Sequence, residues 1–148
     1  MPGEGRSRLD TVRKKANNNK ERMPPTELLV FREANGRIPL EEWLDALPAK
    51  ARAKCLNYMR LLATSGHELR RPAADFLRDG IYELRASYGT VRYRILYFFH
   101  GRDVVVLSHG VTKSQKVPDA EIERAIARKQ LVMKDPVRYA GKLAPKEV

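Results

Sequence analysis

The sequence predicts an α+β fold with helices packed on one face of a mainly antiparallel sheet. The segment from Ile81 to Lys116 contains three runs of β-branched and aromatic residues, and short Gly-containing turns separate them. This is the pattern of a β-meander, in which consecutive strands pair antiparallel. Apolar residues recur at helical spacing in two stretches before it, between Pro39 and Thr64, and in one stretch after it, from Pro118. With 148 residues, the chain is long enough for one domain with extensions.

A strand and two helices are expected before the meander. Residues 27–32 form a short apolar strand, which needs neighbouring strands to be stable. Residues 39–47 carry a proline and two glutamates in their first turn, which favours a helix start, and residues 49–64 carry the longest helical pattern. Residues 67–80 show no clean period, so we expect a connecting loop with a turn of helix near residues 73–77. The predicted order is strand, helix, helix, three-stranded meander, helix.

The second strand of the meander, residues 91–99, carries two arginines on an otherwise apolar face. Strand alternation places Arg92 and Arg94 on the same side as Leu96 and Phe98. An unpaired guanidinium is costly to bury, so we expect both arginines to point into a groove.

Further cations and one histidine fall at the ends of the neighbouring strands. Arg85 closes the first strand, His109 ends the third, and Lys113 and Lys116 follow in the next loop. Antiparallel strands joined by short turns bring these positions near one another. The sequence therefore predicts a cluster of cations around one titratable imidazole.

Such a cluster suits the cleavage of RNA by internal attack of a 2′-hydroxyl, which requires no metal ion. Arginine matches phosphate oxygens bidentately, and histidine, with an unperturbed pKa of about 6.5, suits proton transfer near neutral pH. The lysines can bind phosphate or transfer protons. The predicted catalytic residues are Arg85, Arg94, His109 and Lys113, and the predicted RNA-binding residues are Arg92 and Lys116. No ligand spacing predicts a metal site, and no cofactor is expected.

Structural roles for the same residues stay open. Arg92 could pair with Glu83 across two strands, and His109 could cap a turn or fill a polar pocket. The tyrosines of the meander pack sheets more often than they stack on bases. For the two catalytic arginines and Lys113 we favour function, because three cations at one end of a sheet repel one another unless an anion joins them.

The net charge of +11 favours a polyanionic partner. The basic excess lies mostly in residues 1–26 and 81–117. We expect residues 1–26 to be a disordered basic extension, or alternatively a basic arm that contacts nucleic acid. Residues 27–131 are expected to form the domain, and residues 132–148 a loose basic tail.

The single cysteine, Cys55, lies on the apolar stripe of the longest helix, where a core residue is expected. One cysteine excludes an internal disulfide and fits a reducing cytosol, so a cytoplasmic protein is expected. No apolar run approaches the ~20 residues that span a membrane.

In combination, these signals resemble the HigB-type, phage-derived branch of the RelE/ParE toxin superfamily. The resemblance covers roughly residues 27–131 and rests on Leu84-Arg85, Arg92 to Tyr97, Val104 to Leu107, His109 to Lys113 and Pro118 to Ala125. It implies a RelE-like fold and the toxin of a type II toxin–antitoxin module. Many members cleave mRNA in the ribosomal A site, and others poison DNA gyrase.

The resemblance also implies roles for individual residues. Arg85 matches a basic position at the end of the family's second strand, and Arg94 matches the arginine of a Tyr-Arg pair on the third. Lys113 matches the basic position after the last strand. Some relatives carry a tyrosine near the end of the site, where this chain has Val117-Pro118.

The partners implied are a cognate antitoxin of the helix-turn-helix type, the ribosome and mRNA. The antitoxin is expected to cover the cationic groove with acidic side chains or to dock against the N-terminal helices. The alternatives are a gyrase inhibitor, which needs no hydrolytic histidine, and a non-catalytic phage- or plasmid-derived protein that binds nucleic acid or a partner.

Overall fold

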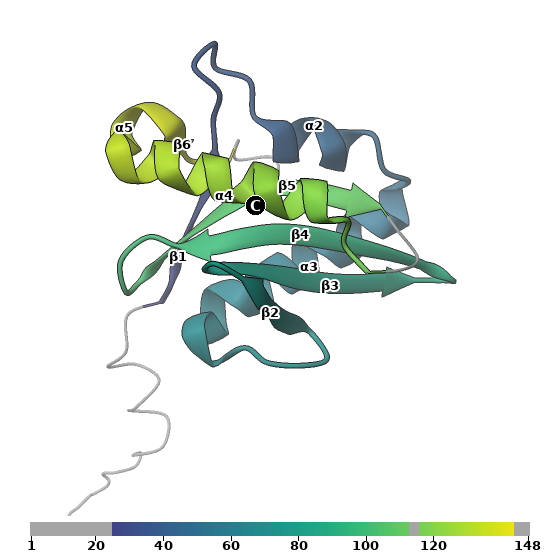
Figure 1. Cartoon of the computed structure of the whole chain (residues 1–148). Helices are drawn as coiled ribbons and strands as arrows, with labels where there is room; N and C mark the ends of the chain where they lie inside the picture. The colour runs from purple at the N-terminus through teal and green to yellow at the C-terminus, as the bar shows by residue number, and fades with distance from the viewer. Residues whose placement is uncertain (1–24, 113–115, 144–148) are drawn as a thin grey trace, which may run out of the picture.

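A computed structural model of the chain describes residues 25–112 and 116–143. Six strands form one sheet in the order β2-β3-β4-β5-β1-β6, with helices on both faces (Figure 1). The elements are β1 (Glu27–Phe31), α2 (Pro39–Asp45), α3 (Ala49–Ser65), the short 3-10 helix η1 (Gly66–Glu68), β2 (Ala74–Arg78), β3 (Ile81–Tyr88), β4 (Val91–Phe99), β5 (Val104–Thr112), α4 (Asp119–Lys134), α5 (Pro136–Tyr139) and β6 (Ala140–Gly141). The α+β class is confirmed.

The sheet is mixed rather than purely antiparallel. β3, β4 and β5 pair antiparallel in sequence order, and β2 adds to the free edge of β3. β1 lies parallel to β5, with Leu29 opposite Val106, and β6 pairs antiparallel with β1. β4 is therefore a central strand whose backbone groups are paired on both sides.

The helices do not share one face of the sheet, so that prediction is wrong. α2 and α3 cover one face and α4 covers the other (Figure 1). The reason lies in β4, where Ile95 and Tyr97 belong to the core under α2 and α3, whereas Leu96 and Phe98 belong to the core under α4. A strand that is apolar on both sides must be covered on both sides.

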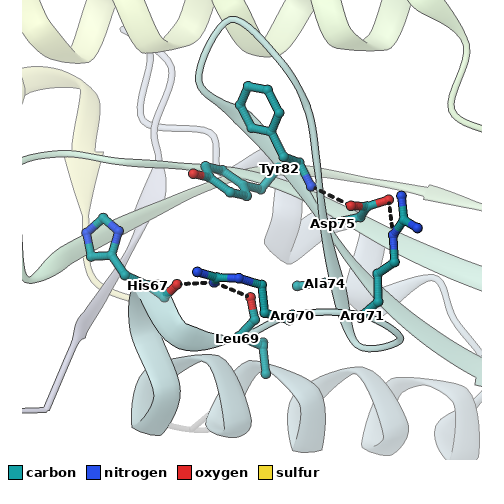
Figure 2. A pocket seen from close by; sticks show the side chains of 8 residues that line it. His67, Leu69, Arg70, Arg71, Ala74, Asp75 and Tyr82 are labelled. Atoms are coloured by element: carbon teal, nitrogen blue, oxygen red, sulfur yellow. Dashed lines mark hydrogen bonds and ion pairs between the residues drawn. The ribbon is translucent and has the colours of Figure 1, made fainter.

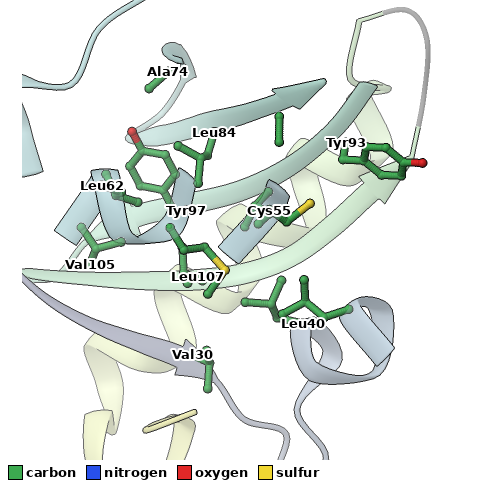
Figure 3. Close-up of a cluster of buried hydrophobic side chains, with 14 of the residues drawn as sticks. Val30, Leu40, Cys55, Leu62, Ala74, Leu84, Tyr93, Tyr97, Val105 and Leu107 are labelled. Atoms are coloured by element: carbon green, nitrogen blue, oxygen red, sulfur yellow. The ribbon is translucent and has the colours of Figure 1, made fainter. Parts of the chain in front are cut away.

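The larger core joins α2 and α3 to the sheet (Figure 3). Leu40 from α2 and Leu62 from α3 are fully buried against the strands, as is Tyr97 of β4. Cys55 also lies in this core, where burial raises the pKa of its thiol to about 12. Its expected place in the core is confirmed.

Two segments that the sequence assigned to loops are regular structure. Residues 74–78 form the edge strand β2, not a turn of helix. The described part of the predicted tail, residues 132–143, completes α4 and supplies α5 and β6. Val132 anchors this part because it is buried in the core under α4, and Arg32 donates from Nη2 to the backbone oxygen of Val137 at 2.9 Å. Residues 1–24 and 144–148 lie outside the described part of the chain.

None of the helices that the structure describes is both long and apolar enough to cross a membrane.

We expect Gly110→Ala to lower the free energy of unfolding by about 1–3 kcal/mol, the usual cost of overpacking a core. A Cβ atom at this position of β5 would lie 2.0 Å from Cδ2 of Trp43, whose Nε1 donates to Thr112 Oγ1 at 3.1 Å. Urea denaturation of the purified protein measures the change. Combining it with Trp43→Leu removes the clash and should recover part of the loss; equal stability of Gly110→Ala and the unmodified protein would contradict this packing.

Candidate functional site

The two predicted catalytic arginines of the meander lie side by side. In the register of the sheet, Arg85 on β3 is opposite Arg94 on β4. Glu83 precedes Arg85 by two residues, so strand alternation puts its side chain on the same face, the one that α4 covers. The strands thus place two guanidinium groups and a carboxylate together.

The carboxylate of Glu83 binds both arginines. Its Oε1 accepts from Nη1 of Arg94 at 2.5 Å, and its Oε2 accepts from Nε and Nη2 of Arg85 at 3.1 and 2.9 Å. Arg85 Nη2 also donates to Asp75 on β2 at 3.1 Å, and the same Asp75 oxygen lies 3.0 Å from Nε of Arg71. We call these five residues, Arg71, Asp75, Arg85, Glu83 and Arg94, the arginine row.

The inner end of the arginine row is buried. Glu83 is 2 % exposed and Arg94 is 6 % exposed, whereas the Arg85 side chain keeps 25 % of its surface. Arg94 therefore does not point into an open groove, as the sequence suggested, but is held by a carboxylate. Its neighbour Arg92 is exposed and makes no ion pair with a described residue, so the alternative pairing of Arg92 with Glu83 is also wrong.

One N–H donor of Arg94 nevertheless lacks a hydrogen-bond partner among the described residues. This donor is the buried Nε atom. A guanidinium offers five N–H donors, and buried donors without partners are rare in folded proteins. Arg94 therefore keeps one N–H donor, at Nε, that none of the described residues uses while its Nη1 is bound to Glu83.

A small cavity of about 250 Å³ adjoins Glu83 on the side of α4. Lys116, exposed in the loop before α4, lines it together with Arg78. Arg78 is held by Asp119 and Glu123 of α4 at 2.7 and 2.6 Å, so Lys116 is the more available cation there. Lys113 lies outside the described residues.

His109 does not join the arginine row but links β5 to α4. Its Nε2 lies 3.0 Å from Oε1 of Glu121, and its Nδ1 lies 2.7 Å from Oγ of Ser108. Burial and the nearby Arg128 guanidinium lower the pKa of the imidazole to about 4. The ring is therefore neutral at pH 7, with Nε2–H donating to Glu121 and the Ser108 hydroxyl donating to Nδ1.

Sequence reasoning did not place the carboxylates of this region in the site, and it named Glu83 only as a possible partner of Arg92. Glu83 could have been found, because it alternates with Arg85 on one strand and so shares its face. Asp75 and Glu121 gave no such signal, since they reach the site only through the pairing of β2 with β3 and the packing of α4 on the sheet. Within residues 25–112 and 116–143, no group of three or more His, Cys, Asp or Glu residues is arranged to hold a metal ion.

Comparison with known proteins places the chain in a family. The family described as "Phage derived protein Gp49-like (DUF891)" matches residues 42–130, which contain the whole arginine row. A protein named "Probable endoribonuclease HigB1", from Mycobacterium tuberculosis strains CDC 1551 / Oshkosh and ATCC 25618 / H37Rv, is 29% identical over 97 residues, which cover 66% of this chain and 76% of the relative. The resemblance to the HigB-type branch is thus confirmed. Since the matched residues make up more than half of its length, the chain belongs to the family of phage-derived Gp49-like proteins.

Proposed function

We propose that this protein is the toxin of a type II toxin–antitoxin module and an endoribonuclease that cleaves mRNA on the ribosome. The observation that carries the proposal is Arg94, a buried arginine with an N–H that no described residue accepts, beside Arg85 and near a cavity lined by Lys116. An arginine pair of this kind stabilises the charge that develops on a phosphate under attack. The name of the mycobacterial relative and the net charge of +11 support the same reading.

In the proposed reaction the 2′-oxygen of a ribose attacks the adjacent phosphorus, and the bond to the 5′-oxygen of the next nucleotide breaks. The products are a 2′,3′-cyclic phosphate and a 5′-hydroxyl, so one proton leaves the 2′-oxygen and one reaches the leaving oxygen. Arg94 and the more exposed Arg85 hold the phosphate oxygens. Glu83 holds both guanidinium groups in place, and Lys113 and Lys116 are proposed to take the proton from the 2′-oxygen and to give one to the leaving oxygen.

His109 is proposed as a positioning residue rather than a proton-transfer group. Both of its ring nitrogens are already hydrogen-bonded, and its side chain is 9 % exposed. By tying β5 to Glu121 in the first turn of α4, it fixes the segment that carries Lys116. The ribosome would add the positioning of mRNA, which is worth several kcal/mol in enzymes generally.

Induced expression followed by primer extension on cellular mRNA tests the proposal. We expect growth arrest with cuts phased to codons, and cleavage by the purified protein only when ribosomes are present. A DNA damage response without mRNA cuts would point to gyrase, and unimpaired growth would refute a toxin.

A charge reversal at the cavity gives a sharper result. We expect Lys116→Glu to slow mRNA cleavage about tenfold or more, because one charge-assisted phosphate contact is worth about 1.5–3 kcal/mol. Lys134→Glu is the matched control, since Lys134 is an exposed lysine at the far end of α4. Equal cleavage by both variants would remove Lys116 from the site.

A further inference from the structure

A second cavity lies at the edge strand β2, next to the arginine row. Its volume is about 570 Å³, within the ~300–1,000 Å³ range of small-molecule sites. The residues that line it include His67, Arg70, Arg71, Asp75, Phe76 and Tyr82. We call it the Phe76 cavity. It combines exposed aromatic surface with positive charge, and the proposed chemistry uses neither Phe76 nor Arg70.

Phe76 supplies the aromatic surface. Its side chain is 53 % exposed on an edge strand, although a phenyl ring normally gains from burial. The ring rests edge-on against Tyr82, with the ring centroids 5.2 Å apart, and Tyr82 in turn stacks on Tyr97 at 5.4 Å. Phe76 is thus held from behind by a fixed aromatic layer while much of its own ring stays open to a ligand.

Arg70 supplies the available charge. Figure 2 shows its side chain directed beneath Tyr82 toward His67, whereas Arg71 is directed the other way, to Asp75. The Arg70 Nη1 group donates to the backbone oxygens of His67 and Leu69, and no described carboxylate pairs with it. Its charge is therefore oriented by the backbone but not neutralised.

An open aromatic ring beside an oriented arginine suits one unpaired nucleotide, whose base stacks while its phosphate binds the guanidinium. The cavity meets the outer end of the arginine row at the edge of the sheet, because Arg71 and Asp75 line it and the same Asp75 oxygen accepts from Arg85 Nη2 at 3.1 Å. The Phe76 ring itself lies on the other face of the sheet, with Tyr82. We propose that the Phe76 cavity binds one unpaired nucleotide of the RNA strand that the arginine row holds, with the strand passing around the edge of the sheet at Arg71 and Arg85. The choice of RNA rests on the proposed function.

Fluorescence anisotropy with a labelled, 2′-O-methylated oligouridine of about eight nucleotides tests this inference on the full chain. The methyl group blocks attack by the 2′-oxygen, so binding is measured without cleavage. We expect Phe76→Ala and Arg70→Ala each to weaken binding about tenfold, and Phe76→Trp to retain it. Arg138→Ala, which removes an exposed arginine on α5 at the opposite edge of the sheet, should change binding less than about twofold.

Competitors identify the source of the nucleotide. Uridine 5′-monophosphate should compete far more weakly than the unlabelled oligonucleotide; equal competition would overturn the RNA strand in favour of a free nucleotide. Unchanged affinity of Phe76→Ala and Arg70→Ala would overturn the inference whatever the cleavage assay shows. Loss of binding in these variants, in a protein that cuts no mRNA, would uphold the cavity and refute the proposed function.

Discussion

Replacement of Arg94 by alanine is expected to slow mRNA cleavage at least about 100-fold and to abolish growth arrest, because in the proposed reaction Arg94 donates to the charge that develops on the phosphate. It should also lower the free energy of unfolding by about 3 kcal/mol. Glu83, 2 % exposed, would keep Arg85 on one oxygen but lose its partner on the other. Primer extension and urea denaturation measure the two effects.

Because the variant is destabilised, a second variant must separate catalysis from folding. Arg94→Met combined with Glu83→Leu replaces the buried pair with apolar groups of similar size, and such replacements are often neutral. Arg85 keeps its bond to Asp75 in this variant. We expect stability within about 1 kcal/mol of the unmodified protein and cleavage still lost; a stable double variant that arrests growth would show that the pair serves folding only.

The sequence predicted the meander because its signals are local. Alternating strand residues and glycine turns specify β3, β4 and β5, and these in turn place Arg85 opposite Arg94. β2 was missed because residues 74–78 are too short to show a period, and they become a strand only by pairing with β3. That pairing depends on contacts distant in sequence, which no local pattern reports.

The environment of the arginines was mispredicted for a related reason. The run Leu96 to Phe99 is continuously apolar, which is typical of a strand buried on both faces. Arg92 and Arg94 on the same strand instead suggested that one face is open to a groove. A strand of this kind draws a helix over each face, and α4 then closes what would otherwise be a groove around Arg94. Which carboxylate meets which cation follows from that packing and not from the alternation of charges along one strand.

His109 should make the folded state sensitive to acid. The groups that face it are Ser108 on β5 and Glu121, Arg124 and Arg128 on α4. Burial and the arginines outweigh Glu121 and lower the pKa of the folded-state imidazole to about 4, against about 6.5 in the unfolded chain. Between these values the unfolded chain binds more protons than the folded protein, so the free energy of unfolding falls as the pH falls. The loss amounts to at most about 3 kcal/mol by pH 4.

Urea denaturation at intervals from pH 7 to pH 4.5 measures this effect. A variant that lacks the imidazole separates it from the titration of carboxylates. We expect His109→Gln to be less stable than the unmodified protein at pH 7, because the two hydrogen bonds of the imidazole are disturbed, and the difference to shrink as the pH falls. His100→Gln, which removes an imidazole from the turn after β4, is the control. Parallel curves of unfolding free energy against pH for His109→Gln and the unmodified protein would show that the ring does not lose a proton on folding. That result would contradict a neutral imidazole that joins β5 to α4.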